Sequence, residues 1–414
     1  MISGIVQTGD GNLADVDQNP SAFSSALIGQ AGNLNTATVQ QEQNGGPGTN
    51  RTRANIAQTG DENAATVLQN TDFNNASNDA FVVQTGNNND ATIDQSGPSN
   101  TATVNQLANG NLATVSQEAD AGGVVLINQT NDDNEANVSQ TSANADAEVQ
   151  QSGTGNLVNL SQGRDAATLY QSNSQQALIL QSGDDNEVDA SQAGTGGDLN
   201  VNQSGNMNFA SVDQSGFSND TGNVASSAGI DQQGFDNDAY VTQSGQLSSA
   251  FIQQIGDFNT GTINQSVNNA PNPPGGPDPA VVTASLTQGG NGNTATINQL
   301  GGNSTQSARL MDASTDQSGD GNTSTINQTN NLVDSDYSAN VASVFQSGNG
   351  NESLLSQNGV DNSATVNQSG DDNDSFITQM GTGNMADVSQ SGIGDTSTVN
   401  QSGMTNSAVV SQGI

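Results

Sequence analysis

The chain has 414 residues, of which 31% are hydrophobic and 3% aromatic, and its formal net charge is −38. Such a composition is typical of disordered chains, so a fold has to come from a strict pattern rather than from a large apolar core. The absence of Cys and His excludes disulfides, thiol nucleophiles and zinc fingers, and only four cationic residues argue against a nucleic-acid partner.

The first ten residues, MISGIVQTGD, show neither a charged segment nor an apolar segment of a secretory signal. If the protein is secreted, we therefore expect this chain to be the mature form with a start Met. No run of about 20 apolar residues occurs, so we expect no membrane-spanning helix.

From residue 5 to residue 412 the chain repeats one frame, Q-x-G-x-x-N-x-A-x-V-x-Q. Asn fills position 6 of the frame in all units but the last, which has Asp395. Position 3 is Gly except for Ala108 and Asn131, and Asn is a residue that tolerates a left-handed backbone. Sixteen units begin at Gln7, Gln30, Gln58, Gln84, Gln106, Gln129, Gln151, Gln181, Gln203, Gln232, Gln254, Gln288, Gln317, Gln346, Gln368 and Gln390.

The Asn, small, aliphatic and Gln positions of the frame alternate with Thr, Ser, Asn and Asp. Alternation with a period of two predicts a β-strand that buries one face and exposes the other, and Gly then forms a tight arc. Weaker half-units follow each strict one, so the full period is at least 22 residues, or two strands and two arcs. We predict an all-β solenoid of about 16 stacked two-strand rungs, with a thin core.

All extra residues fall into the weaker half-units, which places them on one edge of the predicted solenoid. We expect a tail at 1–4, one solenoid at 5–412 and a tail at 413–414. Gln171 fits best inside an insertion. The insertions are predicted near 42–53, 70–78, 163–175, 215–226, 266–282, 300–311 and 329–340.

Stacked rungs would align identical side chains in columns, and amides can donate and accept along such a column. We predict structural ladders that include Gln7, Asn12, Gln18, Gln30, Asn35, Gln41, Gln58, Asn63, Gln69, Gln84, Asn89, Gln95, Gln106, Asn111, Gln117, Gln368, Asn373 and Gln379. The predicted arc glycines include Gly9, Gly32, Gly60, Gly86, Gly153 and Gly370.

The first and last half-units match the interior and carry no sequence typical of a cap. We therefore predict that Ile5, Gln7, Val410 and Gln412 lie at two strand edges that join copies head to tail.

Acid pairs such as Asp132–Asp133, Asp184–Asp185 and Asp371–Asp372 fall in the strict arcs, where we interpret them as a solvated face that slows premature association. No calcium-loop motif is present, and no unit stands out as a catalytic site, so we predict no metal, no cofactor and no enzyme activity. Thr-x-Thr stretches such as Thr294–Thr296 leave an alternative open, a soluble solenoid that binds ice or another surface.

The frame, as in QTGDGNLADVDQ (7–18) and QMGTGNMADVSQ (379–390), strongly resembles the curlin repeat. The resemblance covers about residues 5–412. It implies a β-solenoid, left-handed, that is secreted and assembles outside the cell into curli-type amyloid fibres for biofilm matrix and adhesion. It also implies a nucleator subunit, an outer-membrane secretion pore and a periplasmic chaperone as partners, besides the chain itself. The chain departs from the family pattern in its many repeats, its long insertions and its acidity.

Overall fold

The computed structural model describes residues 2–19, 24–43, 52–71, 77–118, 122–163, 175–217, 227–245, 248–269, 282–304, 311–330 and 339–413. Within these ranges every regular element is a β-strand. The strands fall into two compact units, residues 1–206 and 207–414.

Unit 1 contains seventeen described strands. They are β1 (Ile2–Thr8), β2 (Leu13–Asn19), β3 (Ser25–Ala31), β4 (Thr36–Gln43), β5 (Arg53–Thr59), β6 (Ala64–Thr71), β7 (Asp79–Thr85), β8 (Asp90–Ser96), β9 (Thr101–Gln106), β10 (Leu112–Gln117), β11 (Val124–Gln129), β12 (Glu135–Gln140), β13 (Asp146–Ser152), β14 (Leu157–Gly163), β15 (Gln176–Ser182), β16 (Glu187–Thr195) and β17 (Asp198–Asn206).

Unit 2 contains sixteen described strands. They are β18 (Phe209–Phe217), β19 (Ser227–Phe235), β20 (Asp238–Gly245), β21 (Ser248–Ile255), β22 (Thr260–Asn269), β23 (Val282–Gly289), β24 (Thr294–Ser304), β25 (Met311–Ser318), β26 (Thr323–Asn330), β27 (Asn340–Ser347), β28 (Glu352–Val360), β29 (Ser363–Ser369), β30 (Asp374–Thr382), β31 (Met385–Gln390), β32 (Thr396–Met404) and β33 (Ser407–Gln412).

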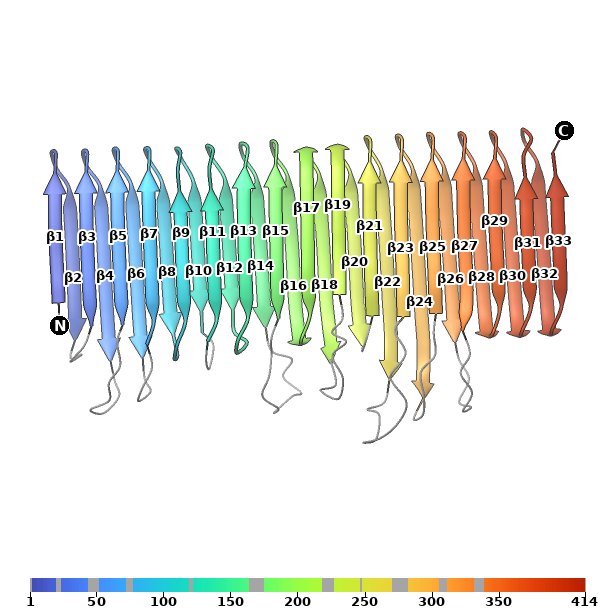
Figure 1. Cartoon of the computed structure of the whole chain (residues 1–414), viewed down its shortest axis with the longest axis horizontal. Helices are drawn as coiled ribbons and strands as arrows, with labels where there is room; N and C mark the ends of the chain where they lie inside the picture. The colour runs from blue at the N-terminus through green and yellow to red at the C-terminus, as the bar shows by residue number, and fades with distance from the viewer. Residues whose placement is uncertain are drawn as a thin grey trace. The chain divides into compact units, whose positions relative to one another are not determined.

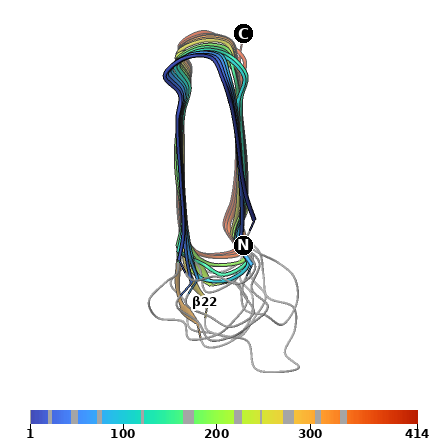
Figure 2. The ribbon, with the colours of Figure 1, turned by 90° about the vertical axis from the view of Figure 1, so that its left-hand side faces the viewer.

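In each unit the odd-numbered strands form one parallel sheet and the even-numbered strands form another; we call these the odd sheet and the even sheet. Strands of one sheet run opposite to those of the other, because an arc reverses the chain after every strand (Figure 1). Viewed end on, the two sheets face each other and the arcs join their edges (Figure 2). Each rung pairs in register with the next, as when Ile5 of β1 pairs with Ile28 of β3, which confirms the predicted β-solenoid fold.

The core lies between the two sheets and is built from small and aliphatic side chains. In β5, Ala54 and Ile56 are fully buried, whereas Asn55 and Ala57 on the outer face are exposed. The same alternation recurs in strand after strand, with Ala opposite or beside Val and Ile. Because every rung buries only two such residues per strand, the core is thin, as the composition requires.

A strict arc, the stretch from position 2 to position 5 of the frame, turns on two left-handed residues. Gly60 has φ of 113° and Glu62 has φ of 60°. A Cβ atom at Gly60 would also collide with the carbonyl oxygen of Gly86 in the next rung. Position 3 therefore requires Gly for rung-to-rung packing as well as for its backbone angle.

The expectation that Asn131 replaces Gly as a left-handed residue is wrong. Neither Ala108 nor Asn131 has a positive φ. In these arcs the N–H groups of Leu107 and Thr130 donate to the carbonyls of Gln129 and Gln151, at 2.9 and 3.0 Å. The regular strands β9 and β11 end here at Gln106 and Gln129, one residue earlier than β7, which runs to Thr85 before its Gly arc.

The seven predicted insertions and Gln171 lie largely or wholly outside the described residues. The residues left undescribed near them are 44–51, 72–76, 164–174, 218–226, 270–281, 305–310 and 331–338. The division of the chain into one solenoid at 5–412 with two short tails stays a prediction.

Candidate functional site

Two columns of Gln run along each unit, one per sheet, at the end of every strand. In the odd sheet of unit 1, the Nε2 of each Gln donates to the Oε1 of the next rung through Gln7, Gln30, Gln58, Gln84 and Gln106, at 2.7–2.9 Å. In the even sheet the same bonds link Gln18, Gln41, Gln69, Gln95 and Gln117, also at 2.7–2.9 Å. We call these columns the Gln ladders.

A Gln ladder also ties the two sheets together. The Nε2 of Gln58 donates to the carbonyl of Thr36 in the even sheet at 2.9 Å and to that of Asn63 at 3.1 Å. Gln58 is 2% exposed. A buried amide is stabilising only when its donors and acceptors are satisfied, and this arrangement satisfies them.

The Asn at position 6 forms a third column, the Asn ladder, where each strict arc enters its even strand. The Nδ2 of Asn63 donates to Oδ1 of Asn35 at 3.0 Å and to the carbonyl of Gly86 at 2.8 Å. Its Oδ1 accepts the backbone and side-chain N–H groups of Asn89 at 3.1 and 3.0 Å. Equivalent side-chain bonds link Asn12 to Asn35 and Asn89 to Asn111.

Unit 2 repeats these columns. Gln346 donates to Gln368 at 2.9 Å, and Gln368 donates to Gln390 at 3.0 Å. Gln379 accepts from Gln357 and donates to Gln401, both at 2.9 Å. Asn373 donates to Asn351 at 3.0 Å and to the carbonyl of Gly392 at 3.1 Å.

The predicted arc glycines Gly9, Gly32, Gly60, Gly86, Gly153 and Gly370 all have φ between 105° and 130°. Together with the amide columns they form a continuous interface between one rung and the next. Every pair of neighbouring rungs within a unit therefore presents nearly the same set of donors, acceptors and close backbone contacts.

Position 4 of the frame carries a further column that the sequence reading missed. The Oδ1 of Asp61 accepts the backbone N–H of Asn33 at 2.7 Å, and the N–H of Asp61 reaches Oδ1 of Asn87 at 2.8 Å. We call this the arc column. Its members are Asp10, Asn33, Asp61, Asn87, Asn109, Asp132, Thr154, Asp184 and Asn206 in unit 1, and Phe235, Asp257, Asn291, Asp320, Asn349, Asp371 and Ile393 in unit 2.

Two facts follow from the arc column. The first Asp of the pairs Asp132–Asp133, Asp184–Asp185 and Asp371–Asp372 is not only solvated, because it accepts a backbone N–H from the preceding rung. In addition, no two Asp residues are neighbours in this column within either unit. The recurrence of Asp or Asn at position 4 of the frame is the sequence signal from which the arc column could have been predicted.

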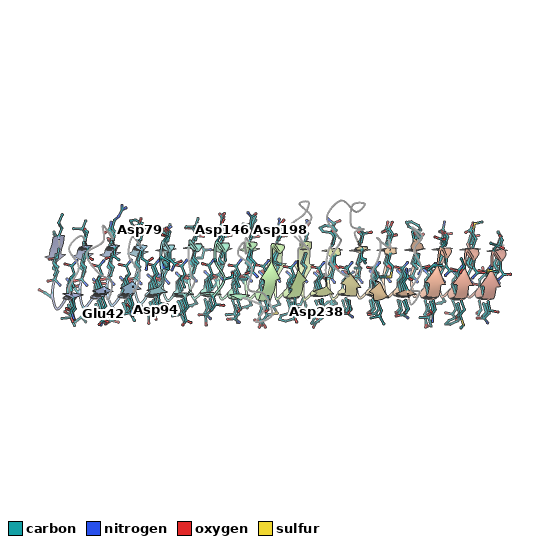
Figure 3. The ribbon with its side chains drawn as sticks, turned by 90° about the horizontal axis from the view of Figure 1, so that it is seen from below. Glu42, Asp79, Asp94, Asp146, Asp198 and Asp238 are labelled. Carbon is teal, nitrogen blue, oxygen red and sulfur yellow. The ribbon has the colours of Figure 1, made fainter. Side chains whose placement is uncertain are left out.

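Several carboxylates sit on the outer faces of the strands, and burial raises their pKa. Burial raises the pKa of Asp90, Asp146 and Asp198, and burial together with the charge of Glu118 raises that of Asp94. Within unit 1, Glu42 and Asp94 lie on one outer face and Asp79, Asp146 and Asp198 on the other (Figure 3). Arg53 forms an ion pair with Asp79 at 3.3 Å and covers the ring of Phe81.

The four residues predicted at the polymerisation ends lie on the first and last described strands. Ile5 of β1 is 46% exposed, whereas the equivalent Ile28 in the next rung is 2% exposed. Gln7 is exposed, and Val410 and Gln412 of β33 are half-buried. These strands thus expose inner-face residues that neighbouring rungs cover elsewhere.

Among the described residues, no group of three or more acidic side chains is placed to hold a metal ion. The described part of the chain also contains no helix that is long and apolar enough to cross a membrane.

Comparison with known proteins gives one family match. The curlin associated repeat matches residues 76–97, 86–118, 225–256 and 354–381. These segments cover strands β7–β10 in unit 1, and β19–β21, β29 and most of β28 and β30 in unit 2. No curated protein sequence matches the chain.

Proposed function

This chain is a curlin-repeat protein, and we propose that it is the structural subunit of an extracellular amyloid-type fibre. In this proposal copies of the chain join head to tail, so that the ladders continue from one copy into the next. The fibre contributes to a biofilm matrix and to adhesion. The role is mechanical rather than catalytic and uses no cofactor.

One observation carries the proposal: the interface between rungs is the same at almost every step and has a direction. Each Gln donates from Nε2 to Oε1 of the following rung, as from Gln390 to Gln412 at 3.0 Å. The Nε2 of Gln7 donates toward the second rung, so its Oε1 is left for the opposite side. On that side, Nε2 of Gln412 from a second copy would donate to it. β33 of one copy would then pair with β1 of the next in the register that β1 and β3 already use.

The finer features that the curlin resemblance implies belong to the same proposal. They are a left-handed solenoid, secretion through an outer-membrane pore with the help of a periplasmic chaperone, and a nucleator subunit. Weak dependence on a nucleator is expected, because a chain with many rungs brings its own folded template.

The experiment dilutes the full chain from denaturant and follows fibre growth by thioflavin fluorescence, electron microscopy and fibre diffraction. Fibres with a spacing of about 4.8 Å along their axis are expected. Ile5→Lys places a charge on the inner face of β1 and should slow seeded growth about tenfold or more. Val6→Lys, on the exposed outer face of the same strand, is the matched control and should grow like the wild type.

A chain that stays monomeric at high concentration would refute the proposal, and equal growth of the two Lys variants would refute the head-to-tail joint.

A second candidate function is a soluble solenoid that binds ice or another regular surface. A column of Thr38, Thr66, Thr92 and Thr114 on the outer face of β4, β6, β8 and β10 favours it. Thermal hysteresis by the monomer, together with absence of fibres, would select this function over the first.

A further inference from the structure

We propose that the outer face of β22, β24 and β26 is a lateral contact through which fibres of this chain bundle. The partner is a second copy of the same surface on a neighbouring fibre. This inference rests on the proposed fibre function and assigns it an interaction surface.

The surface is a regular grid of short polar side chains. In-register pairing stacks three columns across β22, β24 and β26, namely Thr260–Thr294–Thr323, Thr262–Thr296–Thr325 and Asn264–Asn298–Asn327. A fourth column, Ser266–Leu300–Thr329, continues the grid, and Leu300 is 52% exposed. We call these twelve residues the Thr–Asn grid.

The grid is fixed in place by side chains behind it and within it. Ile263, Ile297 and Ile326 on the inner face are fully buried, which fixes the three strands against the core. Asn264 donates to Asn298 at 2.9 Å, and Asn298 donates to Asn327 at 2.8 Å. These bonds already pair part of the amide groups along the column, which lowers the cost of covering them with a partner.

Charge decides which partner this surface admits. The grid contains no acidic residue, and it is the longest acid-free run of strands on the outer face of the even sheet in the described part of unit 2. Asp238 on β20 and Glu352 on β28 flank it in the column that contains Thr260. Two chains of net charge −38 repel each other elsewhere, so a surface without charge, whose side chains recur in each of its three rungs, is where a second copy can approach.

Area explains why the contact belongs to fibres rather than to free chains. Three rungs and four outward positions cover roughly 400 Å². A stable pair of proteins usually buries about 800 Å² on each partner, so two free chains should not dimerise through the grid. A fibre presents the grid once per copy, and many weak contacts then act together.

The test substitutes Thr296→Asp at the centre of the grid. The matched control is Thr103→Asp, a half-buried Thr on the outer face of the odd sheet of unit 1, whose column neighbours Phe81 and Leu126 are uncharged. Preformed fibres of each variant are examined by electron microscopy and low-speed sedimentation at physiological salt, and residual monomer reports assembly itself.

Wild-type and Thr103→Asp fibres should bundle and sediment. Thr296→Asp fibres should remain single, with at least about a fivefold lower sedimented fraction and the same residual monomer within about twofold.

Several outcomes would overturn the inference. If the wild type, Thr296→Asp and Thr103→Asp bundle equally, or if both variants disperse equally, the Thr–Asn grid is not the lateral contact. Single wild-type fibres that bundle only when a neutral polysaccharide is added would assign the grid to that ligand instead. Absence of fibres from every protein would refute the proposed function as well, whereas single wild-type fibres would refute this inference alone.

Discussion

Replacement of one Asn in the Asn ladder tests whether the columns hold the rungs together. Asn63 is 1% exposed and its side chain makes four hydrogen bonds, two as donor and two as acceptor. In Asn63→Ala the carbonyl of Gly86 and the backbone N–H of Asn89 lose these partners. The side-chain amide of Asn89 keeps its bond to the carbonyl of Ala108.

Each buried polar group that loses its partner costs about 1–3 kcal/mol, and the space left by the amide adds to this. We therefore expect Asn63→Ala to lower the free energy of unfolding by about 3–6 kcal/mol. The control is Asn55→Ala, an exposed Asn on the outer face of β5, which should change it by less than about 0.5 kcal/mol.

Urea unfolding of freshly refolded monomer, followed by circular dichroism, gives both values from midpoint shifts at a constant slope. In a repeat protein the loss is local, so hydrogen exchange should also rise first in β5–β8. Equal unfolding midpoints for the two variants would show that the thin apolar core, rather than the ladder, supplies the stability.

Three further predictions concern a glycine, a buried serine and a pair of carboxylates. Gly60→Ala should destabilise the fold strongly, because the added Cβ meets the carbonyl of the next rung, whereas Gly29→Ala, with open space around it, should be neutral in the same urea assay. Ser353→Ala should raise the free energy of unfolding by about 1 kcal/mol, since the buried hydroxyl of Ser353 has no hydrogen-bond partner among the described residues; an unfolding midpoint at or below that of the wild type would contradict this. Burial raises the pKa of Asp90 and Asp94, so the folded state binds more protons than the unfolded state above the ordinary pKa of Asp. Stability should therefore rise as pH falls from 7 to about 4. The double variant Asp90→Asn, Asp94→Asn should show a weaker dependence of the unfolding temperature on pH than the wild type. The same pH dependence in both proteins would contradict this prediction.

The strand pattern could be read from the sequence because the buried face follows a strict period of two. Ala54, Ile56 and Gln58 lie where alternation places them, and the fold follows from stacking such strands. The Gln and Asn columns are a consequence of the in-register pairing that identical frames favour.

The arc conformations could not be read in the same way. At Ala108 and Asn131 the backbone does not adopt the left-handed conformation of the Gly arcs, and residue type alone did not indicate this, because Asn does adopt it at Asn88. The arc column was missed for another reason: Asp61 is surrounded by exposed residues, so its type suggested solvation, while its hydrogen bond to Asn33 depends on rung spacing.

The separation of Asp residues in the arc column constrains how a chain of this kind can change its length. Removing the rung that holds Asn33 would set Asp10 directly against Asp61, two like charges about 4.8 Å apart. Removing the rung with Asn349 would do the same to Asp320 and Asp371. Removing the two rungs that hold Asn33 and Asp61 together would instead set Asp10 against Asn87 and keep the carboxylates apart.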